Sequence, residues 1–168
     1  AAKNPLRLLG DHLALFARSP ARWLKAFLLA LRTNRPGLKG FVWQFFYFAE
    51  AGVLARHLQK NGVSHLHNHF ADSSATLAMI AARMAGLPFS FTLHGPAELF
   101  DPEGWHLGEK VARARFTLCI SHYARAQAML FSDRAHWPRI RIVHCGVEPA
   151  RGGLADRYPR TRVPLPLH

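Results

Sequence analysis

The chain has 168 residues, of which 49% are hydrophobic, so it can bury the core of one domain, and a disordered chain is excluded. Its formal net charge at pH 7 is +12, from 22 Lys and Arg against 10 Asp and Glu. This excess favours anionic partners such as nucleic acid, anionic lipid or phosphorylated substrates, and a solvated basic surface explains it equally well.

The cysteines and the hydropathy of the chain indicate which class of protein it belongs to. Cys119 and Cys145 are too few for a disulfide framework, and both lie in apolar runs typical of strands, so we expect buried thiols in a reducing compartment. Residues 1–20 contain no signal peptide, because they lack a long apolar run. The most apolar stretch, residues 40–55, includes Gln44 and Glu50 and is too short and too polar for a membrane span.

The first part of the chain, residues 1–61, has the periodicity of helices. The first clear helix covers residues 20–33, and one of its faces combines Leu24, Phe27, Leu28 and Leu31, flanked by Arg22, Lys25 and Arg32. A turn sequence at residues 35–40 ends this pattern. A longer helix is predicted from about residue 41 to 59, with Phe41, Phe45 and Phe48 one turn apart and Gly62 beyond its end.

The second part, residues 62–150, alternates short strands with helices. Strands are predicted at residues 63–69, 87–94, 115–121 and 138–147, and helices at residues 72–86, 106–114 and 121–132. This rhythm predicts an α/β domain, a Rossmann-like parallel sheet with helices on both faces. Residues 151–168 are rich in Pro, Gly and Arg and are interpreted as a linker or irregular tail.

Polar and small residues collect where the predicted strands end. In open parallel sheets, ligands bind beyond the carboxyl ends of the strands. We therefore expect a site formed by the residues at the four strand exits: His69, Asp72, His94, Gly95, Ser121, Gly146 and Glu148.

A metal site is the main alternative for the sequence HLHNHFADS, residues 65–73. His65, His67 and His69 would point to the same side of a strand, and two histidines with this spacing can bind zinc. Some metal-dependent hydrolases begin with such a pair followed by an Asp. Here the strand follows a long helical section, and the later strand ends offer few further ligands. We expect no metal, and we expect structural roles for His65 and His67.

Several signals have simpler structural explanations. Asp72 and Ser121 each precede a predicted helix and are expected to cap it. Three acidic residues after His94 are expected to lie in a solvated loop: Glu98, Asp101 and Glu103. The sequence contains no phosphate-binding P-loop, no GxGxxG and no Ser-His-Asp nucleophile elbow.

Taken in order, four segments resemble one family. HLHNHFAD, GLPFSFTLHG, ARARFTLCISHYAR and RIRIVHCGVEP are similar to the N-terminal domain of retaining glycosyltransferases of family 4, of the two-domain GT-B fold. The resemblance is greatest to bacterial exopolysaccharide or colanic-acid-type sugar transferases, and HFAD also resembles sucrose-phosphate synthases. It is sharp from about residue 50 to 149.

The resemblance implies transfer of a sugar from a nucleotide diphosphate sugar to an acceptor, with retained anomeric configuration and no cofactor or metal. It implies that His94, followed by Gly95, lies near the transferred sugar, and that His69 and Asp72 line the acceptor side. Ser121 would lie at the cleft edge. Gly146 and Glu148 would mark the crossover to the second domain.

The family's opening strand and glycine-rich loop would precede residue 1, and its donor domain would follow residue 150. We therefore expect a fragment that is inactive alone. The expected partners are the nucleotide sugar and a glycan or lipid-linked acceptor of cell-surface polysaccharide synthesis, with no nucleic acid. The expected location is cytoplasmic, peripheral on the inner membrane face. The alternatives are a non-catalytic basic module that binds anionic membrane or a partner and, with less support, the metal-dependent hydrolase.

Overall fold

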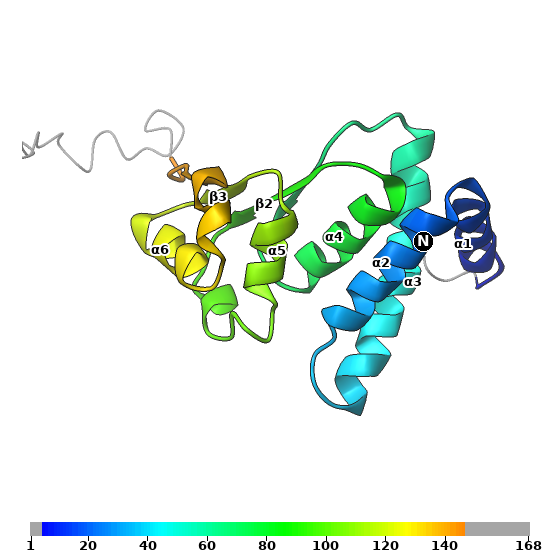
Figure 1. Ribbon diagram of the computed structural model, residues 1–168, viewed down its shortest axis with the longest axis horizontal. Coiled ribbons are helices and arrows are strands. Elements are labelled where there is room, and N and C mark those ends of the chain that lie inside the picture. The colour runs from blue at the N-terminus through cyan, green and yellow to red at the C-terminus, as the bar shows by residue number, and fades with distance from the viewer. Residues whose placement is uncertain (1–4, 147–168) are drawn as a thin grey trace, which may run out of the picture.

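A computed structural model describes residues 5–146 (Figure 1). The chain begins with three helices, α1 (Pro5–Arg18), α2 (Pro20–Arg32) and α3 (Leu38–Lys60). Strands and helices then alternate: β1 (Leu66–His69), α4 (Ser73–Ala85), β2 (Phe89–Leu93), the 3-10 helix η1 (Ala97–Leu99), α5 (Leu107–Arg113), β3 (Thr117–Cys119), α6 (His122–Leu130), the 3-10 helix η2 (Arg134–Arg139) and β4 (Ile140–Ile142).

The four strands form one parallel sheet in the order β1-β2-β3-β4, which confirms the predicted α/β class. The register pairs His69 with Thr92, Leu93 with Cys119, and Cys119 with Ile142. All four strands therefore end at the same edge of the sheet, which is the geometry that places a site there.

The predicted caps are confirmed. Asp72 begins α4 and its carboxylate accepts a 2.8 Å hydrogen bond from the N–H of Ser74, while Gly86 ends the helix with φ 77°. Ser121 begins α6 and accepts from the N–H of Ala124 at 3.1 Å. These short polar and glycine residues fix where each connection turns into a helix.

All four strands are shorter than predicted, and the early end of β4 corrects the expectation for one cysteine. β1 begins at Leu66 rather than at residue 63, and β4 ends at Ile142. Cys145 lies beyond β4 and is exposed, so the prediction that both thiols are buried is wrong for this residue. Cys119 is buried within β3, and its burial raises the pKa of its thiol to about 12.

The main core lies between the sheet and the helices that connect its strands. Phe89, Phe91 and Leu93 of β2 are buried in one cluster with residues of α4, α5 and α6. The strands of this sheet follow one another in sequential order, and helices flank the sheet as in the predicted Rossmann-like class.

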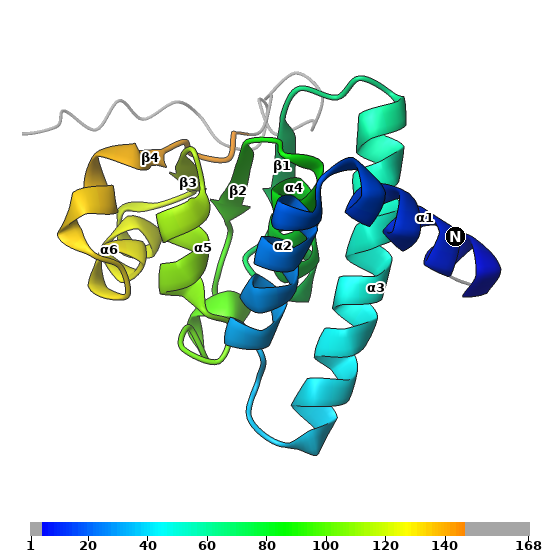
Figure 2. The ribbon, with the colours of Figure 1, turned by 45° about the vertical axis from the view of Figure 1, so that its right-hand side comes forward.

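Helices α2 and α3 pack on α4, and α1 packs on α2 and α3, at the end of the molecule opposite α6 (Figure 1 and Figure 2). The side of α2 that packs is not the apolar face predicted above. Ala26, Leu29 and Ala30 are buried, whereas three residues of the predicted face are exposed: Leu24, Leu28 and Leu31. The surface of α4 is rich in alanine, so small side chains on α2 allow the two helices to approach closely.

Helix α3 has 23 residues and combines apolar and polar positions. Gln44 is buried, and its amide donates hydrogen bonds to the carbonyl of Ala30 and to the hydroxyl of Thr33, which ties α3 to the end of α2. Among the helices of residues 5–146, none has the length and the apolar composition that crossing a bilayer requires.

Phe48 joins the three N-terminal helices. Its ring lies 5.3 Å from the rings of Trp23 and Phe27 and 5.1 Å from that of His12, measured between centroids. We expect Phe48→Ala to lower the free energy of unfolding by about 3–5 kcal/mol, measured by urea denaturation, because it leaves a cavity among these rings. Phe46→Ala, on the same helix but 54% exposed, is the control and should change it by less than about 0.5 kcal/mol. Equal effects of the two substitutions would contradict the packing described.

Candidate functional site

Two histidines meet at the carboxyl edge of the sheet. His69 is the last residue of β1, and His94 follows the last residue of β2. His69 Nδ1 and His94 Nε2 share a hydrogen bond of 3.1 Å, and the two ring centroids are 5.4 Å apart. His69 is exposed and His94 is half-buried, so both imidazoles are accessible to a ligand at this edge.

The turn after β1 brings a third ring to the pair. Phe70 adopts φ 70°, a left-handed conformation that is rare for a bulky residue. The side-chain amide of Asn68 donates to the carbonyls of His69 and Phe70 and stabilises this turn. As a result the ring of Phe70 lies 4.8 Å from that of His94, where it forms an exposed apolar patch beside the two imidazoles.

Glu98 is the residue that holds the two strand exits together. It is 4% exposed, so the prediction of a solvated loop is wrong for this residue. One carboxylate oxygen accepts from the N–H of Ala71 at 2.5 Å, and the other accepts from the N–H groups of His94 and Gly95 at 3.1 and 2.7 Å. Three backbone donors satisfy the buried carboxylate, so burial is compatible with its charge.

Lys110 of α5 holds the same turn from the other side. It is 0% exposed, and its ammonium donates to the carbonyls of Ala71 and Asp72 at 2.6 and 2.8 Å. Glu98 thus binds the N–H of Ala71 and Lys110 binds its carbonyl oxygen. Nothing in the local sequence marked either residue, since a Glu in a loop and a Lys in an amphipathic helix are ordinarily solvated.

These contacts fix the backbone of the edge and leave its side chains free to act. Asp72 accepts from both the N–H and the hydroxyl of Ser74 through Oδ1, which leaves Oδ2 without a protein partner among residues 5–146. His69, His94 and Asp72 therefore offer ring nitrogens and a carboxylate oxygen on a rigid frame. Such groups can bind the hydroxyls of a polar ligand.

The other predicted site residues lie further along the same edge. The N–H of Ile120 donates to the carbonyl of Leu93, so Ser121 follows β3 one strand away from His94. The Ser121 hydroxyl accepts from α6 as its cap. Gly146 is exposed beyond β4, and Glu148 lies outside the described residues. The structure therefore brings His69, Asp72, His94 and Gly95 together, with Ser121 and Gly146 at the next two exits.

His65 and His67 take part in a separate network on the sheet surface. His65 Nε2 and His67 Nδ1 each lie 2.7 Å from the hydroxyl oxygen of Ser90, and His67 Nε2 lies 2.9 Å from that of Thr92. Burial lowers the pKa of His67, and the neighbouring His69 and His65 lower it further. Within the described part of the chain, no group of three or more His, Cys, Asp or Glu side chains could hold a metal ion.

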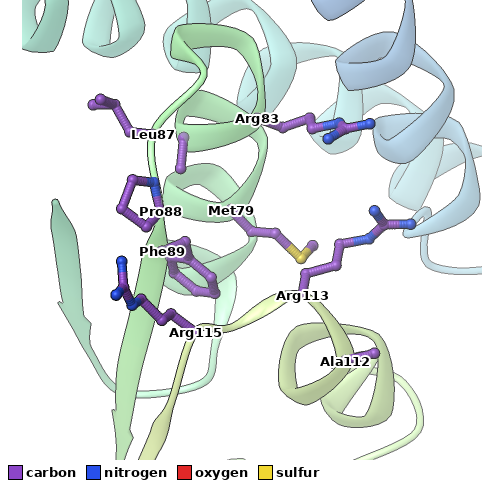
Figure 3. A pocket seen from close by; sticks show the side chains of 9 residues that line it. Met79, Arg83, Leu87, Pro88, Phe89, Ala112, Arg113 and Arg115 are labelled. Carbon is purple, nitrogen blue, oxygen red and sulfur yellow. The ribbon is translucent and has the colours of Figure 1, made fainter. Parts of the chain in front are cut away.

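A cavity of about 380 Å³ lies at the other end of β2 and does not belong to this site (Figure 3). Met79, Leu87 and Phe89 form part of its apolar wall. Arg115 lies on one side of it, while Arg83 and Arg113 extend on the other side toward α2. The three guanidinium groups do not converge on one point, and that of Arg113 pairs with Glu109.

Comparison with known proteins identifies the family. The model of glycosyltransferase family 4 matches residues 6–151, nearly the whole of the described structure. The chain belongs to glycosyltransferase family 4. No curated protein gives a significant match. The family-4 match covers all four strands and the edge at which His69 and His94 meet.

Lys110 makes the stability of this family-4 domain depend on pH. Burial lowers the pKa of Lys110 to about 7; among its charged neighbours Asp72 and Glu98 raise it, and Arg35 lowers it. Between pH 7 and the ordinary lysine value of 10.5, the unfolded chain binds more protons than the folded one, so stability rises with pH.

We expect Lys110→Met, which keeps the volume of the side chain, to reduce this rise by up to about 1.4 kcal/mol per pH unit between pH 7.5 and 9. Urea unfolding at several pH values measures it. Lys60→Met, at the exposed end of α3, is the control and should keep the slope of the unaltered chain. An unchanged slope in Lys110→Met would mean that Lys110 is charged when buried.

Proposed function

We propose that this chain provides the acceptor-side, N-terminal domain of a retaining glycosyltransferase of the two-domain GT-B type. The observation that carries the proposal is the contact between His69 and His94 at the carboxyl edge of a parallel sheet. In this proposal, residues 1–61 form a helical part of the domain and residues 62–150 form its Rossmann-like part. The linker predicted at residues 151–168 lies outside the described residues.

The reaction transfers a sugar from a nucleotide diphosphate sugar to an acceptor hydroxyl. The bond from the anomeric carbon to the diphosphate breaks, and a bond to the acceptor oxygen forms on the same face of the sugar. The acceptor proton passes to the departing diphosphate. The transition state is oxocarbenium-like, and an imidazole such as that of His94 stabilises the sugar hydroxyls as charge develops.

The carboxylates of the site support a mechanism without a protein nucleophile. Glu98 is buried and bound by three N–H groups, so it is not placed to attack a sugar. Asp72 has one oxygen without a protein partner and is better suited to bind an acceptor hydroxyl together with His69. Gly95 permits close approach beside His94, and Ser121 and Gly146, with Glu148, extend the site toward the donor.

The substrate class follows from the family and from charge. We infer a nucleotide diphosphate sugar as donor and a glycan or lipid-linked glycan as acceptor, in bacterial cell-surface polysaccharide synthesis of the exopolysaccharide type. A net charge of +12 is compatible with these anionic substrates. The proposed chemistry needs no metal or other cofactor, because the leaving group itself accepts the proton.

Family membership favours this proposal over the alternatives. A non-catalytic basic module would not require the His69–His94 pair or its buried supports. A metal-dependent hydrolase would use His65 and His67 as ligands, but His65 Nε2 and both ring nitrogens of His67 lie within hydrogen-bond distance of the hydroxyls of Ser90 and Thr92.

The histidine pair is tested by substitution in the full-length enzyme that includes a donor domain. His94→Ala should lower kcat by at least about 100-fold, because stabilisation of developing charge is lost. Radiolabelled sugar transfer measures it, and circular dichroism should show an unchanged fold. His57→Ala, on the surface of α3, is the control and should keep full activity. Unchanged turnover in His94→Ala would refute the assigned role.

A further inference from the structure

Most of the exposed large hydrophobic side chains in residues 5–146 belong to α1, α2 and α3. Elsewhere exposed apolar residues are isolated, as on most proteins. On α1, Leu6, Leu9 and Leu13 recur at helical spacing and are each at least 58% exposed. This face of α1 is therefore an apolar stripe directed away from the core.

The exposed stripes of the three helices adjoin. Leu9 of α1 and Phe45 of α3 line the same apolar cavity. The ring of Phe16 lies 5.6 Å from that of Trp23, which stacks in turn on Phe27 at 5.7 Å, so α1 continues into α2. We refer to the exposed apolar side chains of α1, α2 and α3 as the helical surface.

Helix α2 gives the clearest evidence that the helical surface does not serve to stabilise the core. Its buried side packs on α4, and Leu24, Leu28 and Leu31 lie on the opposite side, each between 45% and 52% exposed. The three exposed leucines lie along one face of a helix whose other face already packs on the core, so their exposure does not stabilise the monomer. An apolar partner is needed to explain them.

The charges beside the helical surface indicate the chemistry of that partner. Six exposed cations on these helices and their connections have no ion-pair partner among the described residues: Arg18, Arg22, Lys25, Arg32, Lys39 and Lys60. Residues 5–60 as a whole contain nine Lys and Arg against two acids. The partner must therefore combine an apolar interior with a negatively charged boundary.

An anionic bilayer has this combination, whereas a second copy of the chain and residues 147–168 do not. A second copy would bring the same unpaired cations into contact with one another. Residues 147–168 carry four Arg against two acids, so they too would be repelled. We propose that the helical surface lies in the headgroup region of an anionic membrane, with Leu24, Leu28 and Phe45 among the upper acyl chains and Lys25 and Arg32 at the lipid phosphates.

Contacts of Trp105 connect the helical surface with the candidate site. The guanidinium of Arg35, in the connection from α2 to α3, lies 4.4 Å from the centre of the Trp105 ring, and the ammonium of Lys110 lies 5.7 Å from it. Lys110 in turn holds the turn that ends at Asp72. If the proposed function holds, a lipid-linked acceptor in the bilayer would meet the enzyme next to its acceptor side.

Vesicle sedimentation tests the membrane contact directly. The full chain is mixed with vesicles of phosphatidylcholine containing 30% phosphatidylglycerol, and with phosphatidylcholine alone. We expect binding to the anionic vesicles at least about 20-fold tighter than to the neutral ones, and weaker binding in 0.5 M NaCl. Failure to bind anionic vesicles, or equal binding to both, would overturn the proposal.

Paired variants separate the apolar and the electrostatic contributions. Leu24→Gln with Leu28→Gln should weaken binding by about 10-fold or more, and Lys25→Gln with Arg32→Gln by about 5-fold per charge, on anionic vesicles only. Leu130→Gln removes a leucine that is 72% exposed on α6, outside the helical surface, and should change nothing. An equal loss in Leu130→Gln would show non-specific adsorption instead.

Two measurements keep the result unambiguous. Thermal unfolding should be similar in all variants, since every substituted side chain is exposed. Sedimentation equilibrium shows whether the chain forms dimers, and a dimer broken by Leu24→Gln with Leu28→Gln in the absence of vesicle binding would assign the surface to a second copy. Vesicle binding does not require sugar transfer, so loss of one proposal leaves the other standing.

Discussion

The peptide unit around Ala71 is the point on which the candidate site depends. Glu98 accepts from its N–H and Lys110 donates to its carbonyl, and both side chains are buried. The other oxygen of Glu98 binds the N–H groups of His94 and Gly95, so one carboxylate joins the exits of β1 and β2. The distance between His69 and His94 is therefore set by a network of hydrogen bonds from buried side chains and not by the loops alone.

Burial of the Glu98 carboxylate and of the Lys110 amine is costly, and the hydrogen bonds of both groups explain why they are retained. Transfer of an ionised group from water costs several kcal/mol unless hydrogen bonds replace its hydration. Here the carboxylate has three backbone donors and the ammonium has two backbone acceptors. Both turns would otherwise leave these groups unsatisfied in the interior. Beyond the ends of the strands, this network takes the place of the hydrogen bonds that join the strands within the sheet. It therefore keeps the edge of the sheet rigid.

Local patterns allowed much of this fold to be predicted. Asp72, Gly86 and Ser121 act within one turn of themselves, so their capping roles follow from sequence. The role of Glu98 could not be recognised, because Ala71, the partner that joins β1 to β2, is 27 residues away and only the fold brings the two together. The prediction of which face of α2 packs was wrong for a related reason. Periodicity showed that Leu24, Leu28 and Leu31 share a face, but the alanine-rich surface of α4 determines which face of α2 packs on it.

The three alternating histidines of residues 65–69 have different roles along the length of one strand. His65 and His67 lie beside the buried hydroxyls of β2, and the ring of Phe116 stacks on both. His69 is two residues further. Its register partner is Thr92, but its ring bonds to that of His94, which follows the end of β2. A histidine on this face of the strand therefore bonds to neighbouring hydroxyls when it lies within the sheet. At the end of the strand it is available to a ligand. Position along a parallel strand, more than residue type, separates a structural histidine from a candidate functional one.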